Sequence, residues 1–159
     1  MAATTIELNE WLECLQAVLG DYAPKHLRFD GEPAGAAAPP DGTEPAAYVA
    51  ILGNGSSMHL GLSSSMDGCR ALTRALLGMR QRDAISDREV VDGMSEILNI
   101  LAGKVKSRLS PRDRSLQMGL PIFVMGPAGH GDDTERATAE AMVGPVRCQL
   151  LVVRQRRAP

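Results

Sequence analysis

Residues 85–109 constrain the fold most, because their pattern predicts one long amphipathic helix with both ends marked. Ser86 followed by Glu89 forms a capping box, which predicts the start, and Pro111 predicts the end because proline cannot continue a helix. Apolar residues recur every three or four positions and form one stripe: Val90, Met94, Ile97, Leu98, Leu101 and Val105. This stripe must pack against another layer of the protein.

The opposite side of this predicted helix carries Asp92, Glu96, Asn99 and Gly103. Glu96 and Asn99 are three residues apart, so their side chains are neighbours on the helix surface. That pair alone is typical of any surface helix. Gly103 is unusual, because a glycine inside a helix costs roughly 1 kcal/mol relative to alanine. On an exposed face, glycine favours close approach by another molecule, so this face is predicted to be a docking surface.

The first helical segment resembles a second copy of this one. Residues 8–22 align with residues 91–105 without a gap. The alignment pairs three residues of the polar sides: Glu13 with Glu96, Gln16 with Asn99, and Gly20 with Gly103. The shared glycine favours an internal duplication, with two long helices related by pseudo-symmetry.

The rest of the chain predicts an α+β fold. The first helix spans residues 4–22, with Thr4 or Thr5 as its cap. The other expected elements are two strands over 46–65 joined at Asn54-Gly55, a helix over 66–80, extended chain over 115–127 interrupted at 119–121, a polar loop over 128–137, and a terminal strand over 146–155 with a hairpin at Gly144-Pro145. This order predicts two long pseudo-symmetric helices packed on a largely antiparallel sheet. We expect one domain over residues 1–159, in which the Pro/Ala/Gly-rich residues 31–45 form a flexible loop.

Composition argues against several classes of function. The net charge of −2 and an aromatic content of 3% favour neither nucleic acid nor an anionic membrane as partner. The sequence has no apolar run long enough to span a bilayer and no signal peptide pattern, so a cytoplasmic protein is expected. The cysteines and histidines are scattered without metal-ligand spacing, and no metal site is expected: Cys14, Cys69, Cys148, His26, His59 and His130.

The stretch SEILNILAGKVKSRL, followed by MGLPIFVMG, resembles the CheX-like branch of the CheC/CheX/FliY phosphatases. The family signature is Glu-x-x-Asn on a long helix, a glycine one turn later, and a Gly-[Leu/Ile]-Pro strand. This sequence matches it with Glu96, Asn99, Gly103 and Gly119-Leu120-Pro121. The stretch YVAILGNGSSMHLGLSSS also fits the early strands of the family. The resemblance covers most of residues 8–153, apart from the long loop.

The resemblance implies a phosphatase that acts on the aspartyl phosphate of a CheY-type response regulator. It implies that Glu96 anchors the partner and that Asn99 orients the attacking water. It also implies a homodimer and no cofactor in this chain, because the regulator supplies Mg²⁺. The first helix departs from the CheC pattern, since its amide is Gln16, so Glu13 and Gln16 stay open as a second site. The alternative is a non-catalytic CheX-like scaffold that binds a response regulator.

The chemistry of an acyl phosphate suits these residues. Hydrolysis needs a water molecule in line with the breaking P–O bond, and positioning is the main lever in phosphoryl transfer. A neutral carboxamide both accepts a hydrogen bond from water and donates one. An anion at the same place would repel the phosphoryl group. An asparagine such as Asn99 is therefore a suitable water-positioning residue.

Overall fold

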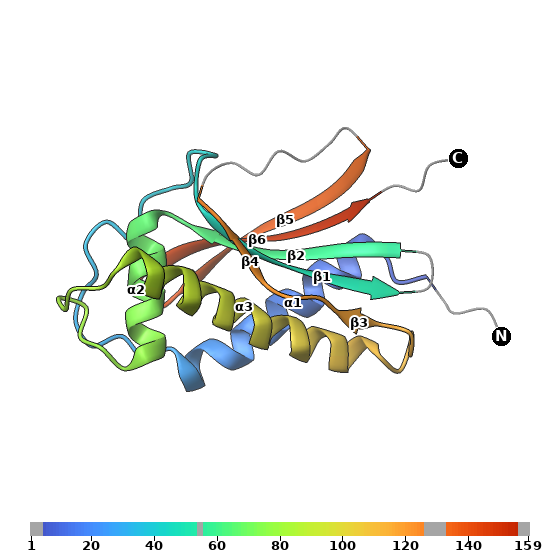
Figure 1. Cartoon of the computed structure of the whole chain (residues 1–159), viewed down its shortest axis with the longest axis horizontal. Helices are drawn as coiled ribbons and strands as arrows, with labels where there is room; N and C mark the ends of the chain where they lie inside the picture. Colours follow the sequence, from blue (N-terminus) through green and yellow to red (C-terminus); the bar gives the residue numbers. More distant parts are fainter. Residues whose placement is uncertain (1–4, 54–55, 126–132, 156–159) are drawn as a thin grey trace.

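The computed structural model describes residues 5–53, 56–125 and 133–155. Within these residues the chain forms helices and strands in the order shown in Figure 1. The elements are α1 (Leu8–His26), β1 (Ala46–Gly53), β2 (Ser56–Ser64), α2 (Met66–Leu77), α3 (Asp87–Leu109), β3 (Gln117–Met118), β4 (Ile122–Val124), β5 (Thr134–Val143) and β6 (Val146–Gln155). No helix among the described residues is both long and apolar enough to cross a membrane.

One antiparallel sheet forms the base of the molecule. Its strand order is β3-β1-β2-β6-β5, and β4 pairs with β1 beside β3. The hairpins β1–β2 and β5–β6 meet where β2 pairs with β6. The predicted α+β class is therefore confirmed, as is the interruption over 119–121, which separates β3 from β4. Asn54 and Gly55, the predicted turn of the first hairpin, lie outside the described residues.

The helices cover one face of this sheet, and each long helix packs on the strands of the other half of the chain. Alternate residues of the central strands face the core, as in Val49, Leu60 and Val152, which stand side by side in register. The N-terminal helix α1 packs against β5 and β6, whereas α3 packs mainly against β1 and β2 and also contacts β3 and β4. In Figure 1 the two long helices cross each other over the sheet. This exchange of partners is the arrangement expected of two related halves.

The predicted boundaries of α3 are confirmed. The Ser86 hydroxyl accepts a hydrogen bond from the Glu89 N–H at 3.1 Å, and the Glu89 carboxylate accepts one from the Ser86 N–H at 3.1 Å. All six residues of the predicted apolar stripe are 0% exposed. The burial of this stripe fixes how the helix is rotated about its axis.

The predicted boundaries of α1 were wrong. Glu7 caps the helix in place of a threonine, because its N–H donates to the Glu10 carboxylate at 2.7 Å. The helix also continues past residue 22 to His26. The ring of His26 stacks on the buried ring of Tyr22, which holds the last turn against the body of the protein.

The loop predicted over 128–137 is also wrong at its end, because β5 already begins at Thr134. This strand lies at the edge of the sheet, so polar residues can alternate with small ones along it. The predicted hairpin at Gly144-Pro145 is confirmed, with Gly144 at a φ of 54°. Residues 31–45 contain no long helix or strand. Ala36 in their middle is buried, and its carbonyl accepts a hydrogen bond from the Arg147 N–H at 3.0 Å.

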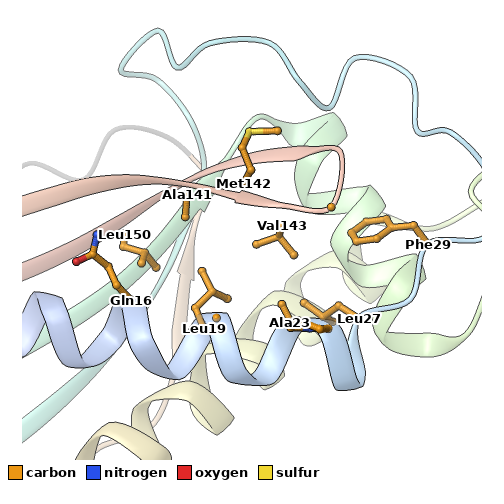
Figure 2. A pocket seen from close by; sticks show the side chains of 12 residues that line it. Gln16, Leu19, Ala23, Leu27, Phe29, Ala141, Met142, Val143 and Leu150 are labelled. Carbon is orange, nitrogen blue, oxygen red and sulfur yellow. The ribbon is translucent and has the colours of Figure 1, made fainter.

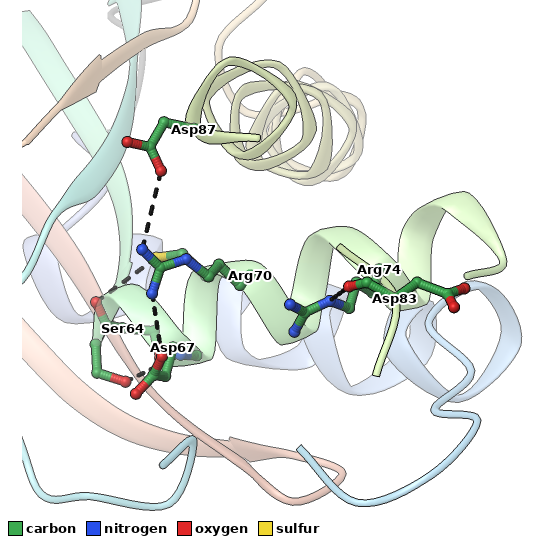
Figure 3. Close-up of polar contacts among 9 residues, drawn as sticks. Ser64, Asp67, Arg70, Arg74, Asp83 and Asp87 are labelled. Atoms are coloured by element: carbon green, nitrogen blue, oxygen red, sulfur yellow. Dashed lines mark hydrogen bonds and ion pairs between the residues drawn. The ribbon is translucent and has the colours of Figure 1, made fainter. Parts of the chain in front are cut away.

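The short helix α2 is tied to the start of α3. Arg70 pairs with Asp67 in its own helix at 3.1 Å and reaches Asp87 in the first turn of α3 at 3.9 Å (Figure 3). Farther along, Gly93 of α3 lies directly against Thr73 of α2. A Cβ atom at Gly93 would stand 2.4 Å from the Thr73 methyl group. The close approach of α2 and α3 therefore requires a glycine at this position.

We expect Gly93→Ala to lower the free energy of unfolding by about 1–2 kcal/mol, because the steric clash outweighs the helix propensity of alanine. Thr73 is buried and β-branched, so it cannot easily turn away. Urea denaturation of the purified variants measures the change. Gly103→Ala in the same helix is the control, since its Cβ would meet nothing within 4 Å, and it should gain about 0.5–1 kcal/mol. Equal stability of the two variants would contradict the packing described here.

Candidate functional site

A groove of about 820 Å³ runs between the last turns of α1 and the second half of α3. One wall comes from α3, the other from α1, and β3 closes the edge. The lining residues are Asp21, Tyr22, Lys25 and His26 of α1, Asn99, Ile100, Gly103, Lys104, Ser107 and Arg108 of α3, and Met118 of β3. The predicted polar side of α3 is therefore not an isolated helix surface, because a second helix stands beside it.

The structure places Glu96, Asn99 and Gly103 on the accessible side of α3, opposite the buried stripe. The Glu96 side chain is exposed, and Asn99 is half-buried in the wall of the groove. Within residues 5–53, 56–125 and 133–155, no cation pairs with Glu96 and no group hydrogen-bonds to the Asn99 carboxamide. Both side chains are thus available to a visiting molecule.

The protein's own packing does not require a glycine at position 103. A Cβ atom there would meet nothing within 4 Å, whereas Gly93 in the same helix is pressed against Thr73. Gly103 instead leaves a stretch of bare backbone in the groove, one turn after Asn99. The predicted reason for this glycine, approach by something outside the chain, is consistent with this geometry.

The sequence analysis missed the α1 wall of the groove. Tyr22 is 4% exposed, and its ring lies 4.8 Å from that of His26, centroid to centroid. Burial raises the pKa of the Tyr22 hydroxyl, and the negative charge of Glu96 raises it further. The carboxylate of Glu96 is therefore close enough to α1 to act on it electrostatically. Tyr22 and His26 are four residues apart, which places their side chains on the same face of α1. This spacing is the sequence feature from which the wall could have been predicted.

An ion pair bridges the two helices within the groove. The Arg108 guanidinium contacts the Asp21 carboxylate at 2.5 Å. Both side chains are substantially exposed, so the pair contributes little to stability on its own. The ion pair instead affects the charge of the groove, because Asp21 neutralises the charge of Arg108.

The second copy of the motif, on α1, faces a different hollow. Glu13, Gln16 and Gly20 are all exposed, and a Cβ atom at Gly20 would meet nothing within 4 Å. Gln16 and Gly20 line a pocket of about 430 Å³ between α1 and the β5–β6 hairpin. Figure 2 shows Gln16 reaching from α1 toward Leu150 on β6, with Met142 and Phe29 farther along the pocket. The structure therefore keeps Gln16 and Asn99 in separate sites.

The two hollows differ in charge. The residues that line the pocket beside Gln16 include no titratable side chain. The groove beside Asn99 contains two lysines and a histidine. Of these two hollows, as the described residues line them, the one beside Asn99 is the one that offers attractive charge to an anionic ligand. In the part of the chain that the structure describes, no three His, Cys, Asp or Glu side chains gather into a group that could hold a metal ion.

A family model, that of the chemotaxis phosphatase CheX, matches residues 45–142, more than half of the 159-residue chain. The chain belongs to the CheX family of chemotaxis phosphatases. The matched range contains Glu96, Asn99 and Gly103, whereas α1 with Glu13 and Gln16 precedes it. No protein of curated function matches the sequence.

Solved structures of CheX proteins share this fold. CheX from Vibrio vulnificus superposes with a TM-score of 0.69 at 14% identity, over 95% of this chain and 100% of that one. CheX in a CheX–CheY–BeF₃–Mg²⁺ complex from Borrelia burgdorferi gives 0.66 at 16% identity, over 96% and 100%. CheX from Desulfovibrio desulfuricans gives 0.65 at 18% identity, over 94% and 100%. At these identities the likeness establishes the fold.

We expect Glu96→Gln to lower the pKa of the Tyr22 hydroxyl, because removing a nearby negative charge makes the phenolate easier to form. The pKa should stay above the ordinary value, since burial contributes most of the shift. Tyr48 is the other of the two tyrosines and is the internal control, because Glu96 does not contribute to its pKa. NMR titration of the tyrosine ring carbons follows both groups at once. An unchanged Tyr22 pKa would contradict the placement of Glu96 beside α1.

Proposed function

We propose that this CheX-family chain hydrolyses the aspartyl phosphate of a CheY-type response regulator, with Asn99 and Glu96 as the working residues. One observation carries the proposal. Asn99 and Glu96 lie on the accessible side of α3 without a hydrogen-bond or ion-pair partner among the described residues, near the bare backbone of Gly103. The Borrelia burgdorferi structure, a complex of CheX with CheY, BeF₃ and Mg²⁺, supports a CheY-type partner.

Asn99 orients the attacking water. Its carboxamide oxygen accepts a hydrogen bond from the water while its NH₂ group donates one, so the water is held in a defined direction. The water oxygen then bonds to phosphorus as the bond from phosphorus to the aspartyl oxygen breaks. The products are the free aspartate, inorganic phosphate and one proton. The contribution of Asn99 is positional, which is the main contribution that a protein makes to phosphoryl transfer.

Glu96 and Gly103 hold the partner in register. Glu96 lies one turn before Asn99, and its carboxylate has no ion-pair partner among the described residues, so it would pair with a lysine at the edge of the regulator's active site. Gly103 lies one turn after Asn99 and lets the partner's surface approach the helix backbone. The Mg²⁺ belongs to the regulator in this proposal, and this chain contributes no cofactor.

The same motif on α1 is a poorer candidate for the reaction. Gln16 stands beside an apolar pocket, and the described residues that line it include no titratable group that would attract a phosphoryl group. The side chain of glutamine is also one methylene longer than that of asparagine, and it would hold the water at a different distance from the helix. We therefore assign the reaction to Asn99.

We expect Asn99→Ala to reduce the rate of phosphate release by about 100-fold or more, because a misplaced nucleophile loses at least that much. The assay measures inorganic phosphate released from a CheY-type regulator charged with acetyl phosphate and Mg²⁺. Gln16→Ala is the matched control, since it truncates the corresponding amide on α1 and should retain full activity. Asn99 is not part of the core, so the variant should fold normally. Full activity of Asn99→Ala would contradict the proposed mechanism.

The alternative is a scaffold that binds the regulator without hydrolysing its phosphate. The same assay separates the two, because a scaffold leaves the rate of phosphate release unchanged or slows it. The presence of Asn99 in the Glu-x-x-Asn motif supports the enzyme, since binding alone does not require a carboxamide at this position.

We expect Gly103→Ala to weaken regulator binding at least fivefold, because the added methyl group occupies the space that the partner needs. Binding is measured by titrating labelled protein with a BeF₃-charged regulator. The gain in folding stability expected for the same variant excludes misfolding as the cause. Gly20→Ala on α1 is the control and should bind normally. Unchanged binding of Gly103→Ala would refute close approach at this residue.

Three broader expectations stay predictions. These are a homodimer, a cytoplasmic location and a single domain over residues 1–159. Sedimentation velocity of the purified chain tests the first.

A further inference from the structure

We propose that Lys25 of α1 and Lys104 of α3 together recognise acidic groups of the partner beside Asn99, so that both long helices form the docking site. This inference rests on the proposed function, since it assumes that a phosphorylated regulator enters the groove. It adds an α1 residue to a site that the family motif confines to α3. It also predicts the orientation in which the partner docks on the groove.

The charges that face the groove are few and can be accounted for. The charged residues that line the groove are Lys25, Lys104, Arg108 and Asp21. Asp21 is already paired with Arg108 at 2.5 Å, so these two charges largely cancel. Lys25 and Lys104 are exposed, and neither forms a salt bridge with any acid in the described parts of the chain. The groove therefore keeps two uncompensated positive charges, one on each wall.

Charge is also separated along α3. Asp92 and Glu96 are exposed on the turns before Asn99, whereas Lys104 follows it. Asn99 thus lies between an acidic end and a basic end of the same surface. A partner that carries a cation on one side of its phosphoryl group and carboxylates on the other fits this surface in one orientation only. The regulator needs carboxylates around its phosphorylation site to hold Mg²⁺, so its own chemistry supplies the acidic side.

A lysine in the second half of a helix also has a simpler explanation, because a cation there offsets the helix dipole. Lys106 serves equally well for that purpose and does not line the groove. Helix stabilisation therefore does not explain why a second lysine of α3 projects into the groove. Lys25 lies in the last turn of α1, where it offsets the dipole of that helix, and its position in the same groove as Lys104 is the additional observation. Lys106 is also a matched control, since the chain contains only these three lysines.

The test compares the double variant K25Q/K104Q with K106Q and the wild-type chain. Binding of a CheY-type regulator charged with BeF₃ and Mg²⁺ is titrated at low and high NaCl, and phosphate release is measured separately. We expect the double substitution to raise Kd about tenfold and to make Kd depend less on the salt concentration. The reason is that exposed charges at the edge of an interface attract the partner electrostatically, and salt screens this attraction. We expect the Kd of K106Q to stay within about twofold of that of the wild type. We expect kcat at saturating regulator to be the same for all three proteins.

The outcomes separate this inference from the proposed function. If the double variant binds as tightly as K106Q, with the same salt dependence, the lysine proposal is overturned, and the assignment of hydrolysis to Asn99 is unaffected. If the wild type binds but releases no phosphate, the catalytic proposal fails, and the loss of binding in the double variant still supports the lysines. Absence of binding by the wild-type chain overturns both.

Discussion

Burial of one apolar stripe on α3 determines most of what this molecule can do. Six side chains of the stripe are fully buried against the sheet and the neighbouring helices, so α3 cannot turn about its axis without exposing them. The rotation that buries Ile97 and Leu101 also points Glu96 and Asn99 away from the core. The direction of the candidate site is therefore set by the hydrophobic effect acting on the opposite side of the same helix.

The contact between α1 and α3 converts that exposed side into a groove. Glu96 is close enough to α1 for its charge to raise the pKa of Tyr22, the Asp21–Arg108 pair joins the two helices, and Lys25 and His26 form the facing wall. Asn99 is half-buried as a result, which restricts its side chain more than a fully exposed position would. A water-positioning residue benefits from this restriction, because its effect depends on holding one orientation. The fold supplies the restriction while leaving the groove accessible.

The two copies of the helix motif show how surroundings decide the use of similar residues. Both copies keep the glutamate, an amide and an open glycine, yet one faces a cationic groove and the other an apolar pocket. The difference comes from the element that faces the motif across each hollow. The β5–β6 hairpin contributes Ala141, Met142 and Val143 to the α1 pocket, whereas α1 itself contributes its polar last turns to the α3 groove. The duplicated pattern therefore predicts two similar surfaces, and the tertiary structure makes them unlike.

The sequence alone determined the elements whose signals are local. The capping box at Ser86, the apolar stripe of α3 and the hairpin at Gly144-Pro145 depend on residues within a few positions of one another, and each was predicted correctly. At the start of α1 the local signal was misread, because the capping box is formed by Glu7 and Glu10 and not by a threonine, whereas at Thr134 the edge pairing with β6 decides the boundary. Only the tertiary structure brought Lys25 and Tyr22 to Asn99, because that contact depends on the angle at which two helices, far apart in the sequence, cross on a shared sheet. No spacing along the chain encodes that angle, which results from packing the core as a whole.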